Sequence, residues 1–339
     1  MKYSTHLLPT LLFLFLISCS STDRVFRAAR EGKKEVLVEY IQEKKDINVL
    51  DKTKSNLLIY AAGFGNLEIV KLLVESGIDV NHSNEFQRTA LMNAVNFNHV
   101  EIVRYLVEKG ADVNAVDYLG WTPTMIACIR YNKDTLKELF KKPVNVNVAN
   151  SQGHSALVLA SMFQFNEGYP FLLAKKADIN QVDSLGESPL LKAINRNDLE
   201  GIKFFLRNKA NPNLITNDQR TGLIILAKKG LLEPIRLMVS SGAKLDMRDK
   251  SGQTPLMWAV NMGETEVIKL LISLGANPNI QDVNGETALI KAVQQENLEL
   301  VQALVTKKTN KFLKDKQNKT ALDYAKEASQ GEILALLKK

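Results

Sequence analysis

The sequence predicts an all-α repeat protein, a solenoid of about ten helix-turn-helix units joined by β-hairpin-like loops. A Thr, Ser, Asn or Asp residue opens each unit and recurs every 33 residues, at positions 23, 56, 89, 122, 155, 188, 221, 254, 287 and 320. An alanine follows five positions later in nine of the ten units. A fixed period of this length indicates supersecondary units that bury their apolar faces against one another.

Residues 254–286 contain the elements of one unit in order. Thr254-Pro255 predicts a capped helix start, because threonine caps helices and proline is favoured in the first helical turn. Apolar residues at three-four spacing over 267–274 predict a second helix, which Gly275 ends. The Asp-to-Gly segment 282–285 then predicts a type I turn. The same order of elements is expected in the other units.

These units resemble ankyrin repeats. The openings TPLMWAV, SPLLKAI and TALMNAV resemble the TPLHxAA opening of that family, and NLEIVKLLVESGIDVN resembles its second helix and exit loop. The resemblance covers residues 23–339. It implies a protein-protein interaction scaffold whose hairpin tips and exposed first-helix edges form a concave recognition surface. It implies no cofactor, and a monomer is expected.

Composition and motifs favour binding over catalysis. The chain is 45% hydrophobic, which is enough for a continuous core, and its two cysteines provide no disulfide framework. Cys128 stands beside a recurrent alanine and is interpreted as a buried small residue. The four histidines are scattered, and no known metal or catalytic motif is present. An Asp or Asn recurs with the repeat period and is interpreted as a turn residue, at Asp51, Asn84, Asp117, Asn150, Asp183, Asp249, Asp282 and Asp315. We therefore expect neither an enzyme nor a metal site.

The N-terminus predicts export and a lipid anchor. Residues 1–18 combine Lys2 with a short apolar run, which suits a signal peptide and is too short to span a bilayer. The tetrad ending at Cys19 resembles the lipobox of bacterial lipoproteins, which implies acylation of Cys19 and a linker over 19–22. An ordinary signal peptide and an uncleaved anchor are the alternatives. Ser20 favours the outer membrane, if the cell has one, and export disfavours nucleic acid as a partner. Asp23 is expected to cap the first helix.

The repeat pattern is weakest around residues 140–176. Pro143 and Lys176 replace helix-ending glycines, Gly168 occupies a core position, and Pro170 lies in the first turn of a second helix. We expect this segment to be the least stable part of the array.

Apolar and aromatic residues gather at the predicted tips of repeats three to six, whereas the tips of repeats eight to ten are mainly polar. Such patches mark interaction sites, and aromatic and arginine residues dominate binding energies. The alternative is that some of these side chains fold back and bridge neighbouring repeats. The predicted partner-binding residues are Phe86, Arg88, Phe97, Tyr118, Leu119, Trp121, Ile129, Arg130, Met162, Phe163 and Leu185.

A basic segment lies near the C-terminus. The formal net charge of the chain is +7. One acidic residue, Asp315, accompanies six lysines in this segment: Lys307, Lys308, Lys311, Lys314, Lys316 and Lys319. Either this is a solvated end of the array, or it contacts anionic lipid, an envelope polymer or an acidic partner. Polyanion or envelope-polymer binding is thus the alternative function.

Overall fold

The computed structural model describes residues 21–338, and in that range it contains twenty α-helices, one short 3-10 helix and no extended strand. The contacts divide the chain after Ala115 into two compact units, which are described separately. No helix in the described range is long and apolar enough to cross a membrane. The predicted signal peptide and Cys19 lie outside the described residues.

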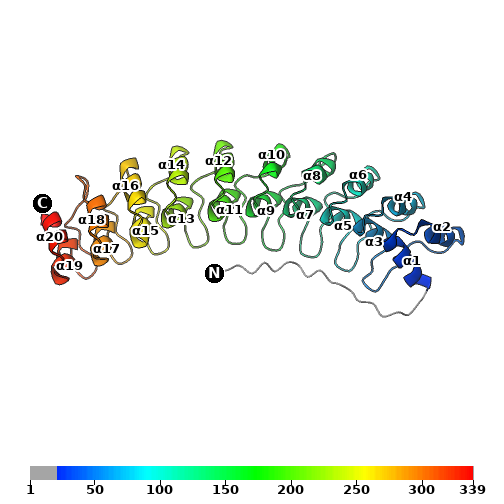
Figure 1. The fold of residues 1–339 in the computed structure, drawn as a ribbon, viewed down its shortest axis with the longest axis horizontal. Coiled ribbons are helices and arrows are strands. Elements are labelled where there is room, and N and C mark those ends of the chain that lie inside the picture. The colour runs from blue at the N-terminus through cyan, green and yellow to red at the C-terminus, as the bar shows by residue number, and fades with distance from the viewer. Residues whose placement is uncertain (1–20, 339) are drawn as a thin grey trace. The chain divides into compact units, whose positions relative to one another are not determined.

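The first unit contains three helix pairs. Within each pair the helices pack together, and like helices of successive repeats also pack together (Figure 1). The first helices are α1 (Ser21–Glu31), α3 (Leu57–Gly63) and α5 (Ala90–Asn96), and the second helices are α2 (Lys34–Gln42), α4 (Leu67–Glu75) and α6 (Val100–Glu108).

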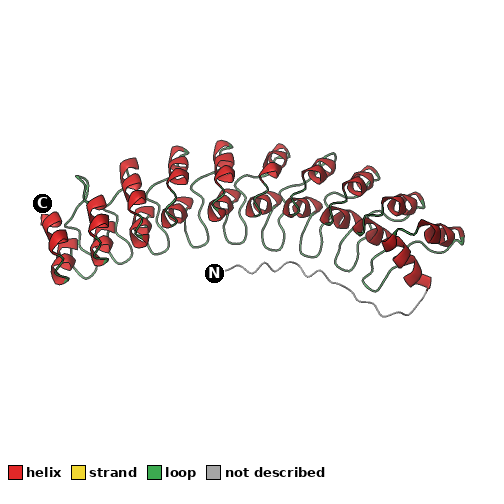
Figure 2. Ribbon diagram, in the orientation of Figure 1, coloured by secondary structure: helices red, strands yellow, loops and turns green. Residues whose placement is uncertain are grey.

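The second unit repeats this arrangement, and Figure 2 shows its long loops projecting beyond the row of first helices, on the side away from the second helices. The first helices are α7 (Pro123–Ile129), α9 (Ala156–Met162), α11 (Pro189–Arg196), α13 (Gly222–Lys228), α15 (Pro255–Met262), α17 (Ala288–Gln294) and α19 (Ala321–Glu327). The second helices are α8 (Lys133–Leu139), α10 (Tyr169–Ala174), α12 (Leu199–Arg207), α14 (Leu232–Ser240), α16 (Thr265–Leu274), α18 (Leu298–Leu304) and α20 (Gly331–Lys338).

The residue that opens each repeat caps its first helix, as predicted, except in the first repeat. Thr254 has an extended backbone, and its hydroxyl accepts a hydrogen bond from Met257 N at 3.3 Å. Asn56 uses its side-chain oxygen in the same way. The prediction for Asp23 is wrong, because α1 already begins at Ser21. Asp23 lies instead in the first turn, where a carboxylate is favoured by the helix dipole.

The recurrent alanine lies between neighbouring helices. The alanines at this position are at most 2% exposed, which lets the first helices of adjacent repeats approach closely. The core is built from this alanine and from the apolar face of each second helix, for example Val267, Ile268 and Leu271 in α16. Cys128 is completely buried and its thiol pKa is raised by burial, which confirms its interpretation as a core residue.

The irregular fifth repeat has a broken second helix. A 3-10 turn, η1 (Asn166–Gly168), precedes α10. A β-carbon on Gly168 would lie 2.6 Å from the Phe165 ring, so this turn requires glycine. Tyr169 follows and is fully buried against Phe205, with ring centroids 4.7 Å apart.

Polar side chains link the loops of successive repeats. In the first unit, Asn81 Oδ1 accepts a hydrogen bond from Asp112 N at 2.8 Å. In the second unit, residues at the same repeat position bind the next loop in the same way, namely Asn147, Asn180, Asn213, Asp246 and Asn279. We call this series the loop ladder. It fixes the spacing of the loops within each unit.

Candidate functional site

The predicted partner-binding residues are divided between the two compact units. In the first unit, Phe86 and Phe97 are 44% and 55% exposed, and Arg88 is half-buried. Phe86 and Arg88 lie in the loop before α5, where their backbone amides donate to Asn84 Oδ1 at 3.0 Å. Phe97 follows α5 and stacks on His99, with ring centroids 6.4 Å apart.

The second unit contains the other eight predicted residues, which differ in exposure. Tyr118 and Leu185 are each 59% exposed, and Arg130 is also exposed. The remaining five are half-buried: Leu119, Trp121, Ile129, Met162 and Phe163. Tyr118 and Leu185 are therefore the most accessible apolar side chains of the predicted set.

Backbone hydrogen bonds join successive hairpin tips. In the second unit, Ser151 N donates to Leu119 O at 2.9 Å, and Asn217 N donates to Leu185 O at 2.9 Å. In the first unit, Glu85 N donates to Thr53 O at 2.9 Å. The tip side chains thus stand on an ordered backbone, which lowers the entropy cost of binding a partner.

The recurrent acidic residues stabilise turns, as predicted. Asp282 Oδ1 accepts hydrogen bonds from the backbone amides of Asn284 and Glu286, at 2.8 and 3.0 Å. Gly285 N donates to Asp282 O at 3.0 Å, which closes the predicted turn, and Gly285 has a φ of +76°.

The second carboxylate oxygen of the turn aspartate often binds a donor nine residues later. Asp51 Oδ2 accepts the hydroxyl proton of Tyr60 at 2.6 Å, and Asp249 Oδ2 accepts the indole N–H of Trp258 at 2.8 Å. Asp282 Oδ2 lies 2.7 Å from the ammonium group of Lys291. These contacts give the second oxygen of the turn carboxylate a structural partner.

A buried charged cluster forms where the loops before the fifth and sixth repeats meet Lys192 of the sixth repeat, and it includes His154. The ammonium group of Lys192 lies 2.6 Å from Asp183 Oδ2 and also pairs with Glu187. Burial opposes the charge of Lys192, but these hydrogen bonds outweigh it and raise the lysine pKa. His154 Nε2 lies 3.4 Å from Asp183 Oδ2, and burial together with the charge of Lys192 lowers the histidine pKa.

The other two histidines in the described range bind the backbone of a neighbouring repeat. His82 Nε2 donates to Lys54 O at 2.7 Å, and His99 Nε2 donates to Gly63 O at 3.1 Å. Within residues 21–338, no group of three or more His, Cys, Asp or Glu side chains is placed to hold a metal ion. The described polar groups thus serve turns, caps and contacts between repeats.

The second unit also contains a groove that the sequence analysis missed. It has a volume of about 510 Å³ and lies between repeats six and eight, with Leu185 at one side and Trp258 at the other. The Lys228 ammonium group lies 5.0 Å from the centroid of the Trp258 ring. Lys229 Nζ donates to the carbonyls of Ile194 and Asn195, and burial lowers its pKa.

The tip positions of a repeat are the two residues after the turn residue, the residue after the turn glycine, and the two residues after the alanine pair of the first helix. In the seventh repeat these are Asn217, Asp218, Arg220, Lys228 and Lys229, and all five line the groove. Trp258 was missed because it stands inside the first helix of its repeat, three residues before the tip position at Asn261.

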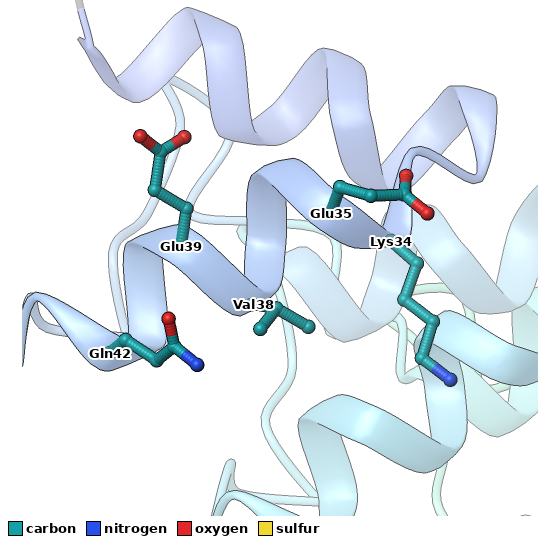
Figure 3. A pocket seen from close by; sticks show the side chains of 5 residues that line it. All are labelled: Lys34, Glu35, Val38, Glu39 and Gln42. Carbon is teal, nitrogen blue, oxygen red and sulfur yellow. The ribbon is translucent and has the colours of Figure 1, made fainter.

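A shallower depression of about 370 Å³ lies on the first unit (Figure 3). All of its lining residues come from α2, namely Lys34, Glu35, Val38, Glu39 and Gln42. Lys34 and Glu39 also form exposed ion pairs, with Glu68 at 3.6 Å and Arg24 at 3.1 Å. Because a single helix lines it, this depression brings no groups together from different elements.

A family model described as ankyrin repeats (3 copies) matches four segments of the chain, residues 25–117, 116–183, 190–282 and 272–339. These segments cover nearly the whole array. The chain belongs to the ankyrin-repeat family. No curated protein matches the chain in the comparison. Ankyrin repeats imply binding to a protein partner, and the family is typically non-enzymatic.

The basic segment of this ankyrin-repeat protein lies in the loop between α18 and α19. Lys307, Lys308, Lys314 and Lys316 are exposed, and Lys311 is half-buried. Lys319 is instead paired with Glu327 at 2.7 Å and lies 5.2 Å from the centroid of the Tyr324 ring. The other five predicted lysines lie within residues 307–316 of this loop.

Proposed function

We propose that this ankyrin-repeat protein is a non-catalytic scaffold of the bacterial cell envelope, attached to a membrane by lipid on Cys19. The lipobox-like tetrad ending at Cys19 supports the attachment, and the ankyrin repeats support the binding of a protein partner. Ser20 favours the outer membrane as its location. The protein acts as a monomer and takes no cofactor.

The observation that carries the proposed partner binding is the exposure of apolar side chains on ordered tips. In the second unit, Tyr118 and Leu185 are each 59% exposed, and the backbone hydrogen bonds between tips hold the hairpins that carry them. Leu185 also borders the groove that ends at Trp258. In the first unit, Phe86 and Phe97 offer a separate apolar contact.

The test of partner binding begins with capture from envelope extract. The full chain is used as bait, the captured protein is identified and its affinity is measured. Tyr118→Ala combined with Leu185→Ala should weaken binding at least tenfold, because truncating a binding hot spot costs about 2 kcal/mol or more. Helical circular dichroism should not change, since both side chains are exposed.

Val283→Ala is the matched control. Val283 is a 47% exposed apolar residue on the hairpin tip of the ninth repeat, outside the predicted surface. Its substitution should leave the affinity unchanged. Equal affinities for the wild type, the double variant and the control would contradict the proposed surface.

The lipid attachment has an independent test. Metabolic labelling with a fatty acid analogue should label the wild-type chain and not Cys19→Ser. The wild type should fractionate with outer-membrane vesicles, and the variant should be released from them. A chain that is never labelled would refute the lipid anchor without affecting the proposed partner surface.

A further inference from the structure

Phe312 stands in the last loop of the described range, at the ladder position. It lies 33 residues after Asn279, where six preceding loops carry an Asn or Asp that binds the next loop. Phe312 is 78% exposed, the highest value among the exposed large apolar residues in the described range. The ladder position of this loop thus carries an apolar side chain that projects into solvent.

The backbone around Phe312 is nevertheless well ordered. Phe312 N donates to Asn310 Oδ1 at 3.0 Å, and Asn310 N donates to Asn279 Oδ1 at 2.7 Å. On either side of Phe312, the carbonyls of Lys308 and Lys314 accept hydrogen bonds from Asn279 and Gln281. The exposure of Phe312 therefore belongs to an ordered loop.

Basic side chains flank this ring in the sequence. Five lysines lie within five residues of Phe312: Lys307, Lys308, Lys311, Lys314 and Lys316. The ion pairs of this part of the described chain involve Lys319 and Lys326 instead. The one acid in the segment is directed inward. Asp315 Oδ1 accepts two backbone hydrogen bonds, Oδ2 accepts the Tyr324 hydroxyl, and the residue is 8% exposed.

We propose that the loop around Phe312 binds the surface of an anionic lipid bilayer. The ring inserts between acyl chains at the interface while the five lysines lie against anionic headgroups. Apolar insertion and basic side chains each add to interfacial binding, and together they favour an anionic bilayer. A soluble polyanion would satisfy the lysines but would leave the phenyl ring in water. This contact is separate from the lipid on Cys19 and from the proposed partner surface.

Vesicle binding tests the proposal. The full chain carrying Cys19→Ser, which cannot be acylated, is mixed with vesicles of phosphatidylcholine alone or with 30% phosphatidylglycerol, and binding is measured by flotation. The chain should prefer the anionic vesicles, and Phe312→Asn should reduce that binding about tenfold, from loss of buried apolar area. Because Phe312 is 78% exposed, this substitution should preserve the fold. Lys307→Ser with Lys308→Ser should reduce binding at least tenfold at low salt.

Ile215→Asn is the matched control, because Ile215 is a 44% exposed apolar residue in the same unit with no lysine within five residues. It should bind the anionic vesicles as the parent does. Phe312→Trp gives a direct readout, since its added fluorescence should be quenched by vesicles containing brominated acyl chains. If the lysine variant loses binding while Phe312→Asn retains it and Phe312→Trp is not quenched, the contact is purely electrostatic and the bilayer proposal is overturned.

Discussion

At the scale of single residues, the residue type nine positions after the turn residue differs according to whether the turn residue is Asp. Where the turn residue is Asp, that position usually holds a donor: Tyr60, Lys192, Trp258, Lys291 or Tyr324. Where it is Asn or Thr, the position holds Leu159, Ile225 or Asn93, and the Asn93 amide donates to Ile59 O instead. A buried carboxylate needs a donor for its second oxygen, whereas an amide or hydroxyl does not carry that charge. Asp117, followed by Ile126, departs from the pattern.

Lys176→Gly should stabilise the protein. Lys176 occupies the helix-ending position with a φ of +63°, a conformation that costs a non-glycine residue about 1–2 kcal/mol. Glycine removes that cost but loses about 0.5–1 kcal/mol through the entropy of the unfolded chain. We expect a net gain of about 0.5–1 kcal/mol, measured by urea unfolding.

The reverse substitution is the control. Gly242 occupies the same position of the repeat with a φ of +92°, and no residue apart from its chain neighbours has a heavy atom within 4 Å of the place that a β-carbon would take. Gly242→Lys should lower the unfolding free energy by a similar amount. If Lys176→Gly is destabilising while Gly242→Lys behaves as expected, the Lys176 side chain stabilises the folded state by more than its backbone conformation costs.

His154 should make the protein less stable in mild acid. Its pKa in the folded state is lowered, first by burial and then by the charge of Lys192. As the pH falls below about 6.5, the unfolded chain binds a proton at this histidine before the folded chain does. The stability present above that pH is therefore lost between the unfolded and the folded pKa. His154→Gln should reduce the difference between urea midpoints at pH 7.5 and pH 5.5. An unchanged difference would assign the pH dependence to other groups.

At the scale of elements, the second helices of the fourth, fifth and ninth repeats depart from the regular pattern. α8 ends at Leu139 and α18 ends at the equivalent Leu304, whereas α6 continues for two more positions. In the fifth repeat, a 3-10 turn replaces the first turn of the helix. Against these losses, Tyr169 packs on Phe204 and Phe205, with ring centroids 5.3 and 4.7 Å away.

Hydrogen exchange should locate the least protected helix in this region. Amides of α8 and α10 should exchange faster than those of α14 and α16, because shorter helices offer fewer cooperative hydrogen bonds. Mass spectrometry of peptides after timed exchange measures this directly. Equal protection in all four helices would show that the aromatic cluster around Tyr169 compensates fully.

The elements themselves were largely predictable from sequence, because their signals are local. Thr254 caps a helix and Gly275 ends one through bonds that reach three or four residues. The exposure of the tips was not predictable. Trp121 and Phe163 are half-buried whereas Tyr118 is open, and this depends on what neighbouring repeats place beside each ring. The groove at Trp258 is lined by residues of several repeats, so its shape depends on how those repeats pack together.

At the scale of the whole molecule, the loop ladder links successive repeats through hydrogen bonds between residues that lie about one repeat apart in the sequence. In a repeat array, stability is the sum of the intrinsic stability of each repeat and the interface energy between neighbours. Within the second unit, Asn213 contributes to one such interface twice. Its Oδ1 accepts a hydrogen bond from Lys244 N at 2.8 Å, and its Nδ2 donates to Gly242 O at 3.0 Å.

Asn213→Ala should therefore reduce the cooperativity of unfolding as well as the stability. Loss of two hydrogen bonds should cost about 1–2 kcal/mol at the interface between repeats six and seven. With that interface weakened, repeats on its two sides can unfold separately, and the guanidinium transition should broaden with a lower apparent m-value. Asn211→Ala is the matched control, because Asn211 Oδ1 accepts a hydrogen bond only from Asn213 N within its own loop. It should shift the midpoint without broadening the transition. If both variants shift the midpoint equally and neither broadens the transition, the apolar contacts between helices alone maintain cooperativity.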